Sequence, residues 1–198
     1  MKTSDYCATL RLEQDIEPWH ILANLEDAIQ KQLAELGDEY VLHDGVAIHN
    51  TAIVDPTATI KAPAIIGADC FIGTHSLLRA GVYLEANVSV GPSCEIKHAL
   101  IGSNSSFAHF NFIGDSVIGS GVNFEAGAIT ANHYNEREDK TIFVRVDGEN
   151  ARIDSVKFGA LIGDGTKVGA NAVTSPGTLL AKNSVVGRLE LIEQVSKI

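Results

Sequence analysis

The strongest constraint on this chain of 198 residues is a repeat of six residues that begins at Ala47. In nine consecutive units the second position holds a branched aliphatic residue: Ile48, Val54, Ile60, Ile66, Ile72, Leu78, Leu84, Val90 and Ile96. A helix repeats its faces roughly every 3.6 residues and a strand roughly every 2. A period of six therefore comes from the path of the chain between short elements.

This period predicts a β-solenoid, in which each unit supplies a short strand and a bend, and three units make one coil of 18 residues. Successive coils pair their strands about 4.8 Å apart, and the branched aliphatic residues stack inside. The period continues after a step of five residues and returns near the C-terminus, with Thr174 as its weak member: Ile101, Phe107, Ile113, Ile118, Phe124, Ile162, Val168, Thr174, Leu180 and Val186.

The predicted solenoid domain spans residues 46–187, and three segments of the chain do not follow its repeat. Residues 1–45 include an amphipathic helix at about 18–36, because leucine and isoleucine recur on one helical face after a proline that a first turn tolerates. Residues 133–157 form a polar excursion. A long excursion from a regular solenoid more often has a function than not. The tail at 188–198 is expected to contain a short closing helix.

Composition narrows the class of protein. A net charge of −10 argues against nucleic-acid binding, which needs basic surfaces. Cys7, Cys70 and Cys94 form no C-x-x-C pair and favour a reducing compartment, and the latter two occupy small positions typical of packing residues. No apolar run reaches about 18 residues and no signal peptide is evident. We expect a cytoplasmic protein that binds neither nucleic acid nor membrane.

Residues 18 apart should face the same side on successive coils. Lys61, Arg79 and Lys97 have this spacing and are therefore predicted to form a vertical basic stripe on an acidic protein. Stacked cations repel one another, which favours a bound anion such as phosphate, a ligand that both arginine and lysine accept. The alternative interpretation is a solvated face on which the charges fall in register by chance.

Glu95 and His109 lie close to this stripe in the sequence. A histidine with a carboxylate nearby can act as a general base near neutral pH. The alternative is an ordinary surface histidine. A zinc site of three histidines would require convergence at a subunit edge, which the spacing does not produce, so no metal is predicted.

The stretch "HFNFIGDSVIGSGVNFEAGAITAN", residues 109–132, resembles the acetyltransferase segment of the bifunctional sugar-1-phosphate nucleotidylyltransferase/acetyltransferases, which make UDP-N-acetylglucosamine. Residues 144–177 are similar to the archaeal and related bacterial branch of that family. The resemblance implies an all-β fold, a left-handed parallel β-helix of hexapeptide repeats with an N-terminal α-helix, assembled as a homotrimer. It does not extend to the nucleotidyltransferase half of those proteins.

The resemblance also implies roles for individual residues. His109 would be the catalytic base that takes a proton from the sugar amine as it attacks acetyl-CoA, with Glu95 as the acidic residue beside it. The remaining matches fall on substrate and cofactor contacts: Arg79 and Lys97 for phosphate, Asn123 and Asn132 for the sugar and acyl region, Lys140 as a further anion contact, and Ala160 and Ala172 beside acetyl-CoA between subunits.

Three departures from the family pattern bear on the substrate. Phe112 stands where a tyrosine is expected, His133 stands near another such position, and Glu125 replaces a glycine. Losing one hydroxyl contact costs about 1–3 kcal/mol if its partner stays buried, which shifts substrate preference more readily than it abolishes chemistry.

The predicted function is an acetyl-CoA-dependent N-acetyltransferase that acts on an amino-sugar 1-phosphate in nucleotide-sugar biosynthesis. The alternative is a non-catalytic trimerising or regulatory partner of a separate sugar-1-phosphate nucleotidylyltransferase. Another acyl acceptor, or a metal enzyme similar to the γ-carbonic anhydrases, remains open from the sequence.

Overall fold

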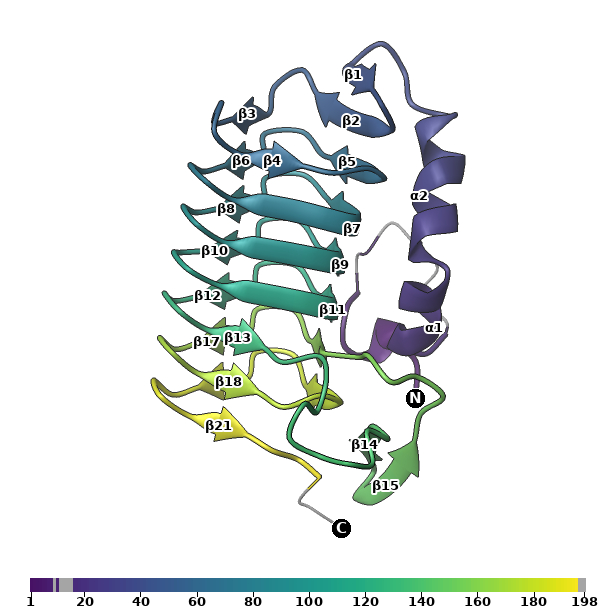
Figure 1. Cartoon of the computed structure of the whole chain (residues 1–198), viewed down its shortest axis with the longest axis vertical. Coiled ribbons are helices and arrows are strands. Elements are labelled where there is room, and N and C mark those ends of the chain that lie inside the picture. The colour runs from purple at the N-terminus through teal and green to yellow at the C-terminus, as the bar shows by residue number, and fades with distance from the viewer. Residues whose placement is uncertain (9, 11–15, 196–198) are drawn as a thin grey trace.

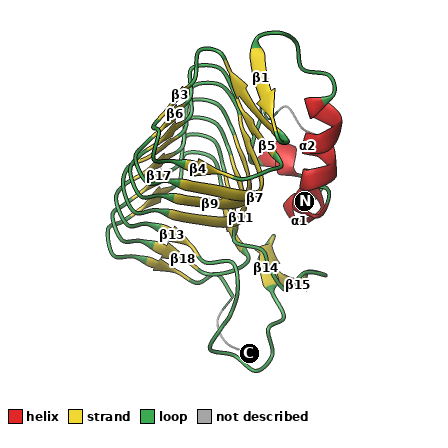
Figure 2. Ribbon diagram, turned by 45° about the horizontal axis from the view of Figure 1, so that its top comes forward, coloured by secondary structure: helices red, strands yellow, loops and turns green. Residues whose placement is uncertain are grey.

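The computed structural model of the protein describes residues 1–8, 10 and 16–195. Across these residues, short strands wind into coils that stack along the long axis of the molecule, as the period predicts (Figure 1). Helices lie beside one side of the stack, and the architecture is mostly β (Figure 2).

Strand pairing divides the described coils between two long sheets. The seven-stranded sheet is entirely parallel and consists of β3 (Ile53–Val54), β6 (Phe71–Ile72), β8 (Ser89–Val90), β10 (Ser106–Phe107), β12 (Asn123–Phe124), β17 (Lys167–Val168) and β20 (Val185–Val186). The twelve-stranded sheet consists of β1 (Tyr40–His43), β2 (Val46–His49), β4 (Thr59–Ile60), β5 (Ala64–Ile66), β7 (Leu77–Leu84), β9 (Glu95–Ile101), β11 (Phe112–Ile118), β13 (Ile129–Thr130), β16 (Ala160–Ile162), β18 (Val173–Thr174), β19 (Thr178–Leu180) and β21 (Leu191–Ile192).

The inward-facing columns predicted from the period are confirmed by the strand register. In one column, parallel pairing stacks Ile48 on Ile66 and Ile66 on Leu84, and the same column continues to Leu180. These side chains belong to one core cluster in the middle of the solenoid. The long strands β7, β9 and β11 turn a corner within their length, where Ala80, His98 and Asp115 have positive φ.

The N-terminal segment packs a second core against the outside of the solenoid. The single helix expected at 18–36 is two helices, α1 (Pro18–Ala23) and α2 (Leu25–Leu33), because Asn24 between them has a non-helical backbone. Leu25 and Ile29 are fully buried in a cluster with the outward-facing side chains of the coils, including Tyr83 and Leu100.

The beginning of the chain reaches a late coil. After a short 3₁₀ helix, η1 (Thr3–Asp5), the backbone N–H of Ala8 donates to Asp164 Oδ2 at 2.8 Å, and the N–H of Asp164 donates to the carbonyl of Tyr6 at 3.0 Å. The same Asp164 carboxylate accepts the N–H of Ser120 at 2.8 Å. One aspartate therefore fixes the N-terminal arm to two consecutive coils.

The excursion at 133–157 contains an antiparallel hairpin, β14 (Phe143–Val146) with β15 (Glu149–Arg152). Its base is closed by a hydrogen bond from the N–H of Phe158 to the carbonyl of Asn132 at 3.2 Å. Tyr134 is buried and donates its hydroxyl to the Pro176 carbonyl at 3.0 Å. The excursion is therefore folded against the solenoid.

The predicted closing helix is wrong for the part of the tail that the structure describes. Leu191–Ile192 is the strand β21, which pairs in parallel with β18 and adds a further rung to the solenoid. A second inward-facing column, which contains Thr130 and Thr174, continues onto Ile192. This segment follows the repeat for that reason. Residues 196–198 lie outside the described residues. No helix among the residues described is long and apolar enough to cross a membrane.

Thr174 allows a test of how side chains are buried in this second column. Its side chain is fully buried, and its hydroxyl has no hydrogen-bond partner in the structure. We expect Thr174→Val to raise the free energy of unfolding by about 1 kcal/mol, since it removes an unsatisfied buried hydroxyl. Urea denaturation followed by circular dichroism measures this change.

Thr130, stacked on Thr174 in the same column, is the matched control. Its hydroxyl accepts the Gly114 N–H at 3.0 Å and lies 3.1 Å from the Ser116 hydroxyl. Thr130→Val should therefore lower the free energy of unfolding by about 1–2 kcal/mol. Equal changes in both variants would contradict the contrast drawn between these two hydroxyls.

Candidate functional site

His109 lies in the turn between β10 and β11, at a corner of the solenoid. Its side chain is exposed and borders a groove of about 620 Å³ on the outer side of the seven-stranded sheet. Asn123 and Glu125 also line this groove, and Asn123 donates its amide to the Ser106 hydroxyl at 2.7 Å. Within the described residues, the imidazole of His109 makes no hydrogen bond or ion pair, which leaves it available to a ligand.

Glu125 is held by Arg188 at the edge of the same groove. The Arg188 guanidinium donates to both carboxylate oxygens, at 2.7 and 2.9 Å, and the N–H of Ala170 donates to Glu125 at 2.9 Å. These hydrogen bonds, with that from Arg188 as the largest cause, lower the pKa of Glu125 to about 2. The carboxylate that replaces a family glycine is therefore partnered.

Two of the three cations of the predicted basic stripe, Arg79 and Lys97, are paired with carboxylates of the protein. Strand pairing places Arg79 directly opposite Lys97 on the next coil, as expected. Glu95 accepts from Arg79 Nη2 at 2.6 Å, so the acidic residue expected beside His109 is paired with the stripe instead. An external anion is therefore not needed to relieve the repulsion between the stacked cations.

Asp115 neutralises Lys97, and the sequence analysis did not predict this contact. Only 4% of this residue is exposed, and its carboxylate accepts from Lys97 Nζ at 2.5 Å and from the amide of Asn132. Burial alone would raise the pKa of Asp115, but hydrogen bonds from His98 and Lys97 outweigh it, and the pKa is lowered. The one available signal was an acidic residue inside the apolar run "FIGDSVIG".

His98 connects this cluster to the N-terminal segment. Its Nδ1 lies 2.9 Å from Asp115 Oδ1, and its Nε2 lies 3.0 Å from the Leu22 carbonyl of α1. Neither the sequence spacing nor the resemblance predicted a role for His98, because its partner in α1, Leu22, is 76 residues away in the chain.

Gly114 leaves room for two neighbouring side chains over the same cluster. It is the register partner of Lys97 on the next coil. A Cβ atom at this position would lie 2.6 Å from Phe112 Cζ and 2.7 Å from Asn132 Nδ2. A side chain at residue 114 would therefore displace Asn132 from Asp115.

The predicted site residues thus fall into two groups on neighbouring faces of one chain. His109 and Asn123 border the groove, whereas the charged cluster comprises Arg79, Glu95, Lys97, His98, Asp115 and Asn132. Lys140 belongs to neither group, since its ammonium donates to the Tyr134 carbonyl within the excursion at 3.3 Å.

The side chains of Ala160 and Ala172 are fully buried and face the core of the solenoid, so only their backbone atoms could contact a ligand on the surface. The expected contacts of these two residues with acetyl-CoA stay a prediction. Ala170 lines the groove.

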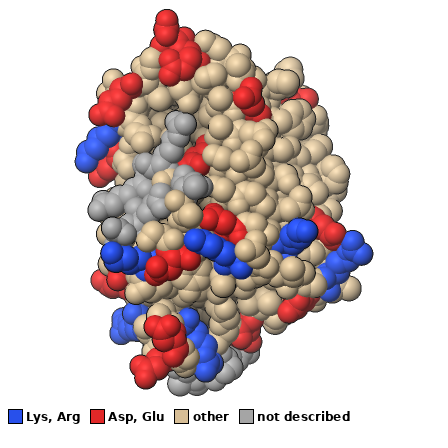
Figure 3. Space-filling model, turned by 180° about the vertical axis from the view of Figure 1, so that it is seen from behind, with Lys and Arg blue, Asp and Glu red and all other residues tan. Residues whose placement is uncertain are grey.

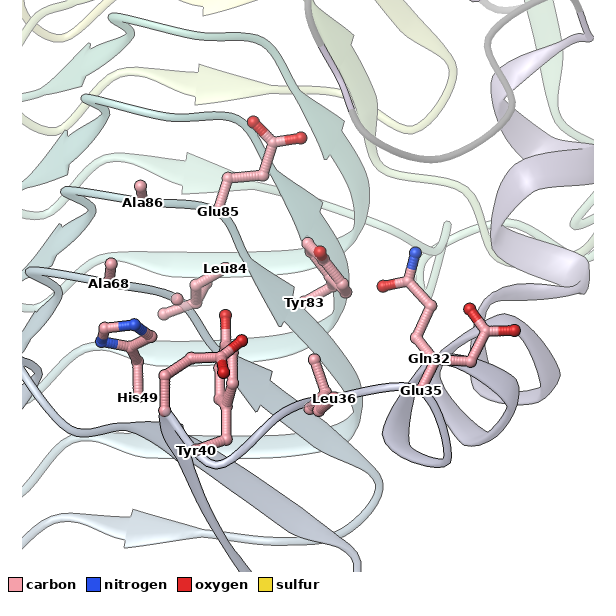
Figure 4. A pocket seen from close by; sticks show the side chains of 12 residues that line it. Gln32, Glu35, Leu36, Tyr40, His49, Ala68, Tyr83, Leu84, Glu85 and Ala86 are labelled. Atoms are coloured by element: carbon pink, nitrogen blue, oxygen red, sulfur yellow. The ribbon is translucent and has the colours of Figure 1, made fainter.

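A second cavity, of about 400 Å³, lies between α2, the β1–β2 hairpin and the coils (Figure 4). Gln32, Tyr40, His49, Tyr83 and Glu85 are among its lining residues, and none of the predicted site residues reaches it. In the residues that the structure describes, no group of three or more His, Cys, Asp or Glu side chains could hold a metal ion.

Comparison with known proteins gives matches over most of the solenoid. Residues 42–142 match the family model of the GMPPB C-terminal domain, and residues 159–187 match a hexapeptide repeat of succinyl-transferase. The bifunctional protein GlmU of Methanococcus vannielii is 36% identical over 118 residues, which cover 59% of this chain and 28% of that protein. GlmU of Carboxydothermus hydrogenoformans is 36% identical over 112 residues, covering 54% and 22%. The chain therefore spans less than a third of these relatives.

Solved structures with a similar chain path have low sequence identity. The polysialic acid O-acetyltransferase OatWY has a TM-score of 0.42 at 17% identity, covering 75% of this chain and 74% of that chain. PerB from Caulobacter crescentus, in complex with CoA and GDP-perosamine, has a TM-score of 0.31 at 15% identity, covering 81% and 58%. Similarity at this level carries no argument about mechanism.

The three cysteine thiols allow a test of the burial of the protein core. Cys7, Cys70 and Cys94 are free and buried. Burial raises the pKa of Cys7 to about 12, helped by the charge of Asp164, and burial raises the pKa of Cys70 to about 11. We expect no reaction with Ellman's reagent in the folded protein at mildly alkaline pH, and three reactive thiols per chain in urea. Rapid labelling of any one thiol before unfolding would contradict this arrangement.

Proposed function

Because the chain belongs to the family of GMPPB C-terminal domains and shares its solenoid with GlmU proteins, we propose that it is an acetyl-CoA-dependent N-acetyltransferase whose acceptor is an amino-sugar 1-phosphate. The observation that carries the proposal is His109, an exposed imidazole at the edge of an open groove that makes no hydrogen bond or ion pair with the described side chains. Asn123, anchored by Ser106, is the polar group beside it.

In the proposed reaction, His109 acts as the general base. The sugar amine attacks the thioester carbonyl, a C–N bond forms, and the imidazole takes the proton that the amine loses. The C–S bond then breaks, and the imidazolium returns a proton to the leaving thiolate to give CoA. Holding amine and thioester in attack geometry beside His109 removes much of the entropic cost of their encounter.

Arg79 and Lys97 would bind the phosphate of the acceptor without breaking their ion pairs. A guanidinium has five N–H donors and an ammonium has three, so each retains donors beyond those that Glu95 and Asp115 use. The Arg79 side chain is 35% exposed and that of Lys97 is 15% exposed. Arg79 would therefore make the first contact with an incoming anion.

We also propose a homotrimer of left-handed coils, in which the groove of one subunit meets its neighbour. The outward positions of the seven-stranded sheet are uncharged from Ile53 through Asn123, and Phe71 and Phe110 are exposed. A broad area without charged side chains is visible from behind the molecule (Figure 3). Exposed apolar area of this kind favours a protein interface.

Turnover tests the proposed activity. We expect thiol release from acetyl-CoA with glucosamine-1-phosphate or galactosamine-1-phosphate, and a loss of about a hundredfold or more in kcat for His109→Ala. His43→Ala is the matched control, because His43 is 86% exposed on the β1–β2 hairpin, away from the groove, and should leave kcat unchanged. Absence of turnover in a correctly folded wild-type assembly would contradict the proposal and favour a partner module of a separate nucleotidylyltransferase.

The subunit interface has its own test. We expect wild-type protein to sediment with the mass of three chains, and Phe71→Glu to reduce that mass, because a buried charge opposes association. Val156→Glu is the control, since Val156 is 65% exposed in the excursion. A monomeric wild type, or equal loss of mass in both variants, would refute the proposed interface.

A further inference from the structure

Asp115 connects more of the candidate site than any other described residue. One oxygen, Oδ2, accepts from both Lys97 and Asn132, and the other, Oδ1, faces His98 at 2.9 Å. Lys97 and Asn132 are two of the side chains assigned to the acceptor. Lys97 lies in β9, whereas Asn132 follows β13 on a different coil. A single buried carboxylate therefore fixes the position of one relative to the other.

The backbone of Asp115 makes this placement specific. Its φ of 45° lies in the left-handed region and turns the corner within β11, so the side chain points to the α1 side of the solenoid. Aspartate tolerates this conformation better than most residues. The residue type thus satisfies both the corner and the hydrogen bonds.

His98 extends the network to a segment outside the solenoid. The Leu22 carbonyl can only accept a hydrogen bond, so His98 Nε2 donates to it, and the Asp115 carboxylate accepts from Nδ1. When both ring nitrogens carry a proton, His98 donates to both partners at once. The cluster then holds three cations, His98, Arg79 and Lys97, against the carboxylates of Glu95 and Asp115.

We propose that Asp115 is a positioning residue for the phosphorylated acceptor, and that His98 makes α1 a structural part of this acceptor site. This inference rests on the proposed function. Asp115 holds Lys97 and Asn132 where phosphate and sugar bind, and the Leu22 carbonyl holds His98 against Asp115. The proposed function assigns Lys97 and Asn132 to the acceptor and not to acetyl-CoA. The effect of moving them is therefore expected on the binding of the acceptor.

Asp115→Asn tests the proposal with little change in volume. The carboxamide replaces one acceptor oxygen by a donor, which cannot satisfy Lys97, Asn132 and His98 together. We expect the KM for glucosamine-1-phosphate to rise about tenfold or more, the scale of a lost hydrogen bond between charged groups. The KM for acetyl-CoA should stay within about twofold and kcat within about threefold of wild type, where a merely structural defect would lower kcat or the active fraction.

Asp164→Asn is the matched control. Asp164 also ties the N-terminal segment to the solenoid, through Ala8 and Ser120, but it contacts none of the charged cluster. It should destabilise the protein without changing the KM for the acceptor. His98→Ala, which removes the link to Leu22 while leaving the Lys97 ion pair, should raise the same KM by a smaller factor.

The possible failures are distinguishable. If wild type turns over and Asp115→Asn keeps its KM for the acceptor, or if Asp164→Asn raises that KM equally, the positioning role is overturned while the proposed function stands. If wild type shows no turnover with either amino-sugar phosphate, the proposed function fails and the acceptor role of Asp115 fails with it. Nitrogen NMR of labelled histidine then tests the remaining network: two protonated ring nitrogens in His98, lost in Asp115→Asn, support it, and a singly protonated ring overturns it.

Discussion

Parallel strand pairing between successive coils is the interaction on which the rest of the molecule depends. Each coil buries its aliphatic residue only if the next coil supplies the stacked equivalent, so the core exists as columns that run through the whole stack. The same pairing fixes which outward residues become neighbours. Arg79 meets Lys97, and Ser106 meets Asn123, because the backbone ladder sets them one rung apart.

Strand pairing connects each coil only to its immediate neighbours. The N-terminal segment contacts coils that are far apart along the stack. Asp164 joins the N-terminal arm to a late coil, and the Leu22 carbonyl of α1 reaches His98 on β9. Both contacts are hydrogen bonds to side chains that lie at corners of the solenoid. The corners carry polar side chains, among them the exposed His109 and the buried Asp115 with its partner His98.

The sequence predicts the solenoid well because the aliphatic residue that recurs every six positions is the one that faces the core. Ile48, Ile66 and Leu84 stack as the spacing requires. The electrostatics of the site could not be read in the same way, since the choice of Glu95 for Arg79 rather than for His109 depends on side-chain direction across coils. The strand β21 was missed although Ile192 continues the period, six residues after Val186.

The hydrogen bond between Phe158 and Asn132 closes the base of the excursion, which therefore projects from a single coil. The chain leaves and re-enters the stack at nearly one point, so the number of residues between these two positions is not fixed by the columns on either side. Loop-closure entropy rises only slowly with length. Relatives of this solenoid can therefore lengthen, shorten or replace this excursion and alter the surface beside Asn132, while the number of coils and the core remain the same.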